Sequence, residues 1–96
     1  MKNLLLFVLL LFSLVVGAQT KVGGTVVDED NQPVAFANIL FKGSYEGTIT
    51  DDNGNFYMES DGDHTTLVVS FIGYENVEIP LESKVTYKMK VVMKEA

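Results

Sequence analysis

The sequence predicts an all-β protein, a seven-stranded antiparallel β-sandwich. Apolar and polar residues alternate with a period of two through most of the chain after residue 18, which places successive side chains on opposite faces of a strand. Clusters of Gly, Asn, Asp and Pro interrupt these runs at spacings of about 8 to 12 residues, as in small sandwiches and barrels. No segment after residue 18 repeats apolar residues at helical spacing over several turns.

Each expected strand is bounded by turn residues and has a definite inward face. Val22 and Val26 share a face of the first strand, and Ile39 and Phe41 share a face of the second. Three consecutive apolar residues, 67–69, predict that the fifth strand is more fully buried than the others. The expected strands cover residues 21–28, 36–42, 47–50, 55–60, 65–71, 74–79 and 84–94, the sixth being closed by Pro80, which cannot donate to a ladder.

The last strand has the clearest alternation, because a shift of one residue would bury its lysines. These lysines either guard a sheet edge against aggregation, which is the commoner role, or form a cationic stripe for an acidic partner. In the second case the interaction surface is Lys84, Lys88, Lys90 and Lys94. The expected inward face holds Val85, Tyr87, Met89, Val91 and Met93, and the outward face holds Lys84, Thr86, Lys88, Lys90, Val92 and Lys94.

The chain begins with a segment typical of a secretory signal peptide. Lys2 precedes an almost wholly apolar run, residues 4–16, and Val16 and Ala18 supply short side chains at positions −3 and −1 of a cleavage site. The run is too short to cross a hydrocarbon core, which needs about 20 residues. We therefore expect export, a signal peptide over residues 1–18, cleavage between Ala18 and Gln19, and one domain over residues 19–96.

Composition excludes several classes of function. The chain has 96 residues, no Cys, no Arg, a single His and a formal net charge of −6. Without Cys there are no disulfides, no Cys-based zinc sites and no Cys nucleophile. An acidic chain without Arg also lacks the cationic surface that nucleic acid phosphates require.

His64 is the one residue that could act as a histidine general base. It lies in a polar turn, where Asp61 or Asp63 could orient it and Ser60 or Ser70 could be the nucleophile. An exposed turn does not supply the buried carboxylate and the enclosure that such a triad needs. We therefore expect no catalytic residue and no enzymatic activity.

The acidic turns are candidates for calcium binding. Residues 28–30, 51–53 and 61–63 form three clusters rich in carboxylates. An EF-hand needs Gly at the sixth position of its loop, and counting from Asp51 that position is Phe56. Asp and Asn are also ordinary turn residues, because their side chains bond to nearby backbone. The sequence therefore predicts no metal and no cofactor.

Exposed tyrosines could stack on a sugar ring. Tyr45, Tyr57 and Tyr74 are the expected outward rings. The simpler explanation is a set of scattered surface tyrosines, which are common. The phenylalanines expected in the core are Phe41, Phe56 and Phe71.

Three parts of the chain carry a resemblance to a known family. The first comprises residues 24–28, 32–34 and 37–39, the second 47–51 and 54–56, and the third 67–74. In this order and at these spacings, nearly all of residues 21–94 resembles carboxypeptidase regulatory-like domains. The resemblance implies a transthyretin-like (prealbumin-like) β-sandwich. Within it, Gly47 and Gly54 are expected to permit turns with positive φ.

The resemblance also implies a setting. Such domains occur as N-terminal periplasmic extensions of starch-utilisation-type TonB-dependent outer-membrane receptors in Bacteroidetes-like bacteria. The chain is thus expected to be a non-enzymatic exported interaction module, a domain of or accessory to a nutrient-uptake receptor. Its expected partner is a receptor or a TonB-system component, and it meets the membrane only through that partner or a C-terminal barrel beyond Ala96. The alternative is a free-standing secreted module that binds glycans weakly or serves in adhesion.

Overall fold

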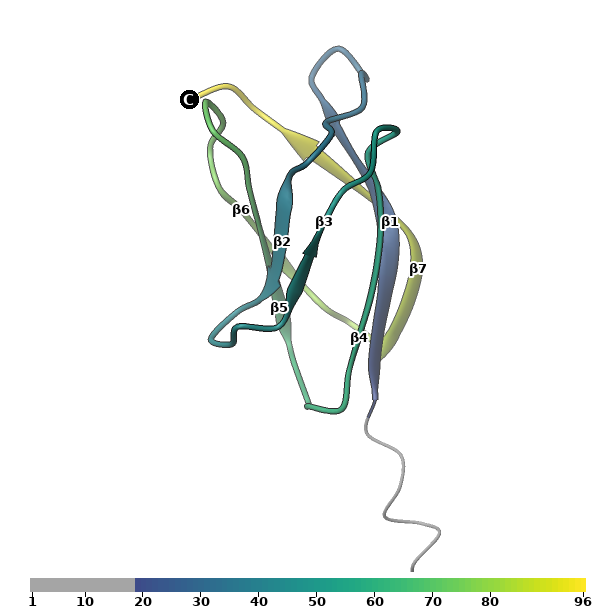
Figure 1. The fold of residues 1–96 in the computed structure, drawn as a ribbon. Coiled ribbons are helices and arrows are strands. Elements are labelled where there is room, and N and C mark those ends of the chain that lie inside the picture. Colours follow the sequence, from purple (N-terminus) through teal and green to yellow (C-terminus); the bar gives the residue numbers. More distant parts are fainter. Residues whose placement is uncertain (1–18) are drawn as a thin grey trace, which may run out of the picture.

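The computed structural model describes residues 19–96, which form two β-sheets packed face to face (Figure 1). The predicted all-β class with seven strands is confirmed. The predicted signal peptide, residues 1–18, lies outside the described residues. Within residues 19–96 no helix is long and apolar enough to cross a membrane. The strands are β1 (Thr20–Asp28), β2 (Asn38–Phe41), β3 (Gly47–Ile49), β4 (Asn55–Ser60), β5 (Thr66–Ser70), β6 (Val77–Pro80) and β7 (Val85–Met93).

The strands are divided between a three-stranded and a four-stranded sheet. Sheet A has the order β4-β1-β7, and sheet B has the order β3-β2-β5-β6. The predicted antiparallel pairing holds for every pair except β1 with β7, which is parallel. Each connection reverses the chain, so β1 and β7 run in the same direction and must pair in parallel when they become neighbours (Figure 1). β7 lies at the edge of sheet A, where a lysine-guarded edge was expected.

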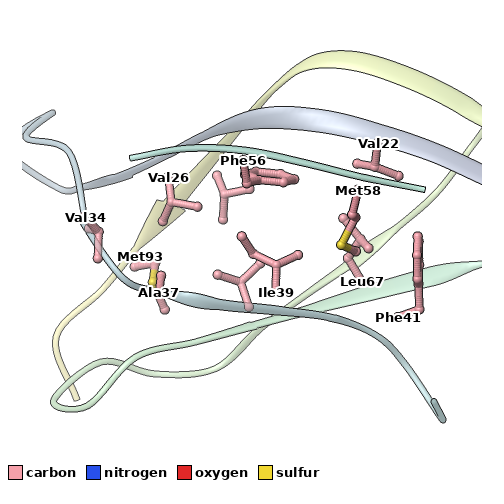
Figure 2. Packing of buried hydrophobic residues seen from close by; sticks show 12 residues of the cluster. Val22, Val26, Val34, Ala37, Ile39, Phe41, Phe56, Met58, Leu67 and Met93 are labelled. Carbon is pink, nitrogen blue, oxygen red and sulfur yellow. The ribbon is translucent and has the colours of Figure 1, made fainter. Parts of the chain in front are cut away.

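The hydrophobic core fills the space between the sheets (Figure 2). Every buried residue of the core cluster lies between Val22 and Met93, so residues 19–96 carry their own core and should fold alone. The predicted inward faces of β1 and β2 are confirmed, and Phe56 of β4 lies in the core as expected. The cluster comprises Val22, Val26, Val34, Ala37, Ile39, Phe41, Phe56, Met58, Leu67, Val69, Val91 and Met93.

Two predictions about sheet B are corrected. β5, expected to be more fully buried, has one buried face only: Leu67 and Val69 are buried, whereas Val68 is half-buried on the outer face. The outer face of an antiparallel sheet can meet solvent, so alternation persists even through an apolar run. β2 begins at Asn38 and not at Phe36, because Phe36 has a φ of 61°, outside the extended region.

The two glycines expected in positive-φ turns differ. Gly54 has a φ of 77°, as predicted. Gly47 does not have a positive φ; a Cβ there would instead collide with the Ile39 carbonyl oxygen and the Leu40 side chain. Gly47 therefore serves close packing against β2 and not a left-handed turn.

β7 contains a bulge that changes which residues face inward. Val22 pairs with Thr86 and Gly24 pairs with Met89, so β7 has one residue more than β1 between these points. Lys88, within this interval, has a φ of 62°. A bulge of this kind reverses the alternation of side chains beyond it.

The bulge makes the predicted inward face of β7 correct only from Met89 onward. Val91 and Met93 are buried as expected. Val85 and Tyr87, also expected inside, are 47% and 56% exposed. Sequence alternation could not reveal this reversal, because the residues keep a period of two on both sides of the bulge.

Candidate functional site

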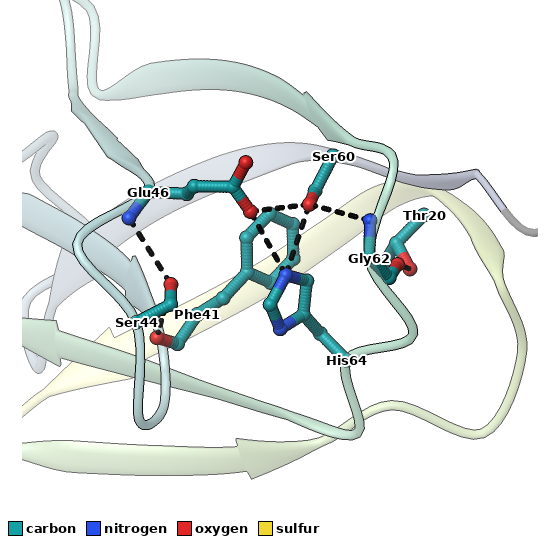
Figure 3. A network of polar contacts seen from close by, with 7 residues as sticks. All are labelled: Thr20, Phe41, Ser44, Glu46, Ser60, Gly62 and His64. Atoms are coloured by element: carbon teal, nitrogen blue, oxygen red, sulfur yellow. Dashed lines mark hydrogen bonds and ion pairs between the residues drawn. The ribbon is translucent and has the colours of Figure 1, made fainter.

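His64 lies at a corner where the β2–β3 turn meets the connection between β4 and β5 (Figure 3). Its Nε2 atom is 2.9 Å from Glu46 Oε2 and 2.9 Å from Ser60 Oγ. Its ring stacks on Phe41, with centroids 4.3 Å apart and planes 8° apart. We call Phe41, Glu46, Ser60 and His64 the His64 corner.

The sequence anticipated only part of this corner. Ser60 was among the expected partners of His64, whereas the contacting carboxylate belongs to Glu46 and not to Asp61 or Asp63. Glu46 lies on a different turn, and only the pairing of strands brings the two turns together. No local motif in the sequence could have identified this partner.

The hydrogen bonds of the His64 corner assign its protons. Ser60 Oγ donates to the Glu46 carboxylate and accepts the Gly62 N–H at 3.0 Å. An ionised carboxylate only accepts, so with Glu46 ionised the Nε2 atom of His64 carries the hydrogen in its bond to Glu46. The pKa of Glu46 is lowered, most strongly by the hydrogen bond from Ser60 and next by the hydrogen bond from His64.

The His64 corner does not have the geometry of a catalytic triad. A triad needs the acid on one imidazole nitrogen and the serine on the other. Here both partners meet Nε2, and within residues 19–96 no hydrogen bond reaches Nδ1. A protonated Nε2 cannot take the proton of Ser60. The corner instead acts as a clamp between a turn of sheet B and the end of β4.

The acidic turns use their carboxylates to hold backbone. Two of them share one pattern, in which an Asp oxygen accepts the N–H groups two and four residues later. Within residues 19–96, no three acidic or histidine side chains are grouped as metal ligands. The bonds, each 2.9 Å, run from Asp30 and Gln32 to Asp28 Oδ1, and from Asn53 and Asn55 to Asp51 Oδ1.

The four lysines of the predicted interaction surface are all exposed, but the bulge prevents them from forming one stripe. Lys90 lies opposite Thr25 in sheet A, and Lys88 belongs to the bulge. Lys84 precedes β7, and its Nζ is 3.7 Å from Asp63 Oδ1. Lys94 follows β7, where its carbonyl oxygen accepts the Glu75 N–H. The role of these lysines as an interaction surface stays a prediction.

The three tyrosines expected to form a sugar platform lie in separate places. Tyr45 is fully exposed in the β2–β3 turn. Tyr74 packs on Phe71, with centroids 5.8 Å apart. Tyr57 lies on β4 and pairs with Tyr87 of β7, with ring centroids 6.3 Å apart and planes 19° apart. Sequence reasoning missed Tyr87 because it assigned that residue to the core.

The sequence of this chain is similar to that of one domain family and to parts of several receptors. Residues 22–96 match the family model for the CarboxypepD_reg-like domain. A TonB-dependent receptor of Formosa agariphila is 39% identical over 67 residues, which is 70% of this chain and 6% of that receptor. TonB-dependent receptor SusC of Bacteroides thetaiotaomicron is 42% identical over 78 residues, 80% of this chain and 7% of that receptor. The chain therefore spans less than a tenth of these relatives.

Solved structures show the same fold at low identity. A chain of a cohesin–X-dockerin complex from Acetivibrio cellulolyticus has a TM-score of 0.66 at 18% identity, covering 79% of this chain and 58% of that one. The 3-chlorocatechol 1,2-dioxygenase of Rhodococcus opacus has a TM-score of 0.60 at 11% identity, covering 83% and 61%. At these identities the likeness concerns the β-sandwich alone.

Proposed function

This chain belongs to the CarboxypepD_reg-like domain family, and from that premise we propose that it is a periplasmic interaction domain of, or accessory to, a TonB-dependent outer-membrane receptor. The observation that carries the proposal is the match to such receptors, at 39% and 42% identity over most of this chain. The predicted signal peptide over residues 1–18 agrees with export to the envelope. In this role the domain contributes contacts with a protein partner.

The arrangement of polar groups supports a role in contact rather than catalysis. The one histidine has its protonated Nε2 bonded to both Glu46 and Ser60, so it cannot serve Ser60 as a base. The acidic side chains Asp28 and Asp51 are engaged by backbone N–H groups within their own turns. The likeness to a dioxygenase, at 11% identity, carries no chemistry to this chain.

The experiment that tests the proposal begins with native cells. The cells are fractionated, and the domain is detected with an antibody raised against residues 19–96. The intact mass of each protein that the antibody recognises is then measured. A species in the periplasm or outer membrane that begins at Gln19 is the expected result. A larger outer-membrane species would show that the domain is part of a receptor, and a small one retained by a receptor would show an accessory. Recovery only from the cytoplasm with residues 1–18 intact would contradict the proposal.

A further inference from the structure

We propose that the outer face of sheet A is the contact surface of this domain, and that it binds an acidic segment of a partner protein. This inference rests on the proposed function and names the surface and the partner chemistry. Three features meet there: a pair of exposed tyrosines, a bulge that turns one of them outward, and lysines that form no ion pair with any residue of 19–96.

Gly23 leaves the space in which the rings of Tyr57 and Tyr87 lie. Gly23 of β1 pairs with Tyr57 of β4 and is itself buried. A Cβ at this position would lie 3.3 Å from Cδ2 of Tyr57 and 3.7 Å from Cδ1 of Tyr87. Both rings therefore lie against Gly23 from the two flanking strands, and its missing side chain lets them approach each other.

The rings are held in place yet remain open to solvent. The Tyr57 hydroxyl donates to Glu59 Oε1 at 2.6 Å, which fixes that ring along β4. Tyr57 and Tyr87 are still about half exposed, at 50% and 56%. Rigid tyrosines that bury much area at little entropic cost are typical anchors of protein interfaces. A pre-positioned pair of this kind suits docking of another chain.

The bulge exposes apolar surface that a regular strand would bury. Without the extra residue near Lys88, the alternation of β7 would carry Tyr87 and Val85 toward the core with Met89. The bulge leaves both on the outside, and Val92, beyond it, is also 45% exposed. Exposing three large side chains on one sheet forfeits burial, which a partner covering that sheet would recover.

Charge indicates the chemistry of that partner. The chain is acidic overall, yet Lys21, Lys88 and Lys90 lie on β1 and β7 of this sheet. Within residues 19–96, none of these three makes an ion pair. Glu59, opposite Lys21, accepts the bond from Tyr57 and keeps its negative charge, so one carboxylate stands against these three lysines on the outer face. A local positive surface on an acidic domain favours a negatively charged segment and steers its approach.

The outer face of sheet B provides a contrast. It exposes Leu40 and Ile49, and a shallow groove of about 400 Å³ lies between β2 and β3. Its lysine, Lys42, is paired with Glu78 at 2.5 Å. Among residues 19–96, this face therefore has apolar surface but no uncompensated positive charge for an acidic segment.

The test is an NMR titration of residues 19–96. The probe is a capped octapeptide of alternating Glu and Tyr, and the matched probe is an octapeptide of alternating Lys and Tyr. We expect the acidic peptide to shift the amides of Gly23, Lys90 and Val92 and to leave those of Leu40 and Ile49 in place. Added salt should weaken the binding, because the lysines are exposed. Equal binding of both peptides, or shifts confined to Leu40 and Ile49, would overturn the proposal.

Variants separate charge from the tyrosine anchors. Lys88→Glu with Lys90→Glu should weaken the acidic peptide about tenfold, because charge complementarity is reversed. Tyr87→Ser should weaken it similarly, whereas Tyr45→Ala, a change of an exposed tyrosine elsewhere, should not. Unchanged affinity in both sheet A variants would refute the assignment. Cell fractionation tests the receptor-associated role and does not depend on these binding results. Failure of the binding tests would therefore refute the assigned contact surface and leave the receptor-associated role standing.

Discussion

The His64 corner and the outer face of sheet A both collect side chains that can take part in chemistry or recognition. At the corner, Glu46, Ser60 and His64 bond to one another, and the imidazole is covered on one side by Phe41. On the sheet A face, the rings of Tyr57 and Tyr87 and the ammonium of Lys90 face solvent. Groups that satisfy one another stabilise the fold, whereas groups left open are available to a partner.

The largest loss of stability should follow removal of the Phe41 ring, which supports the His64 corner. Phe41 is fully buried and forms both part of the core and the surface on which His64 stacks. Phe41→Ala should lower the free energy of unfolding by about 3–5 kcal/mol, since it leaves a cavity in the core. Urea denaturation measures this loss. A loss below about 1 kcal/mol would show that the corner is not packed as described.

His64 itself should matter for stability and not for binding. His64→Ala removes the donor to Glu46 and the ring over Phe41, and should cost about 1–3 kcal/mol. His64→Gln keeps an N–H donor and serves as the control, with a smaller loss. If His64→Ala leaves stability unchanged but abolishes binding of the acidic peptide, the division between corner and face is wrong.

Low pH should weaken the His64 corner and leave the outer face of sheet A unchanged. The bonds from Ser60 and His64 depress the pKa of Glu46 below its usual value of 4.5. Its contribution to stability is therefore full above pH 4.5 and is lost as the pH falls through the lowered pKa. Glu46→Gln should lack this part of the acid dependence in urea denaturation at a series of pH values. An identical acid dependence in the wild type and the variant would contradict the assignment.

Alkaline titration examines the sheet A face in the same way. The hydrogen bond to Glu59 raises the pKa of Tyr57 to about 12. The contribution of this bond to stability is present below pH 10, the usual pKa of tyrosine, and is lost as the pH rises through about 12. Ultraviolet absorbance of tyrosinate should show one late phase, which Tyr57→Phe removes and Glu59→Gln moves to lower pH. A late phase that persists in Tyr57→Phe would assign it to another ring.

The smallest change in stability should come from the lysines. Lys88 and Lys90 are exposed and make no ion pair within residues 19–96. Replacing both by Glu should leave the free energy of unfolding within about 0.5 kcal/mol of the wild type. Thermal denaturation checks this expectation. A much larger loss would show that these lysines guard the structure of the edge rather than a contact surface.

Local patterns predicted the features that depend on neighbouring residues in the sequence. Alternation placed Val22, Val26, Ile39 and Phe41 in the core, because in a strand the side-chain direction follows directly from position. Gly54 was predicted in a left-handed turn, since its turn chemistry is contained in a few residues. These predictions did not require knowledge of which strands pair.

The features that were missed depend on pairing between distant segments. The partnership of Glu46 with His64 requires two turns to meet at one corner of the sandwich. The outward position of Tyr87 depends on a register shift against β1, which alternation alone conceals. The parallel β1–β7 pair likewise follows from the order of strands and not from any strand sequence.

Site-specific photo-crosslinking in native cells would compare the two outer faces where the domain works. A photoreactive residue is placed at Val92 on sheet A or at Ile49 on sheet B, both exposed to a similar degree. We expect the Val92 position to crosslink to a TonB-dependent receptor through an acidic segment that mass spectrometry identifies, and the Ile49 position to give little product. Crosslinking from Ile49 alone, or from Val92 only to segments rich in lysine, would contradict the account.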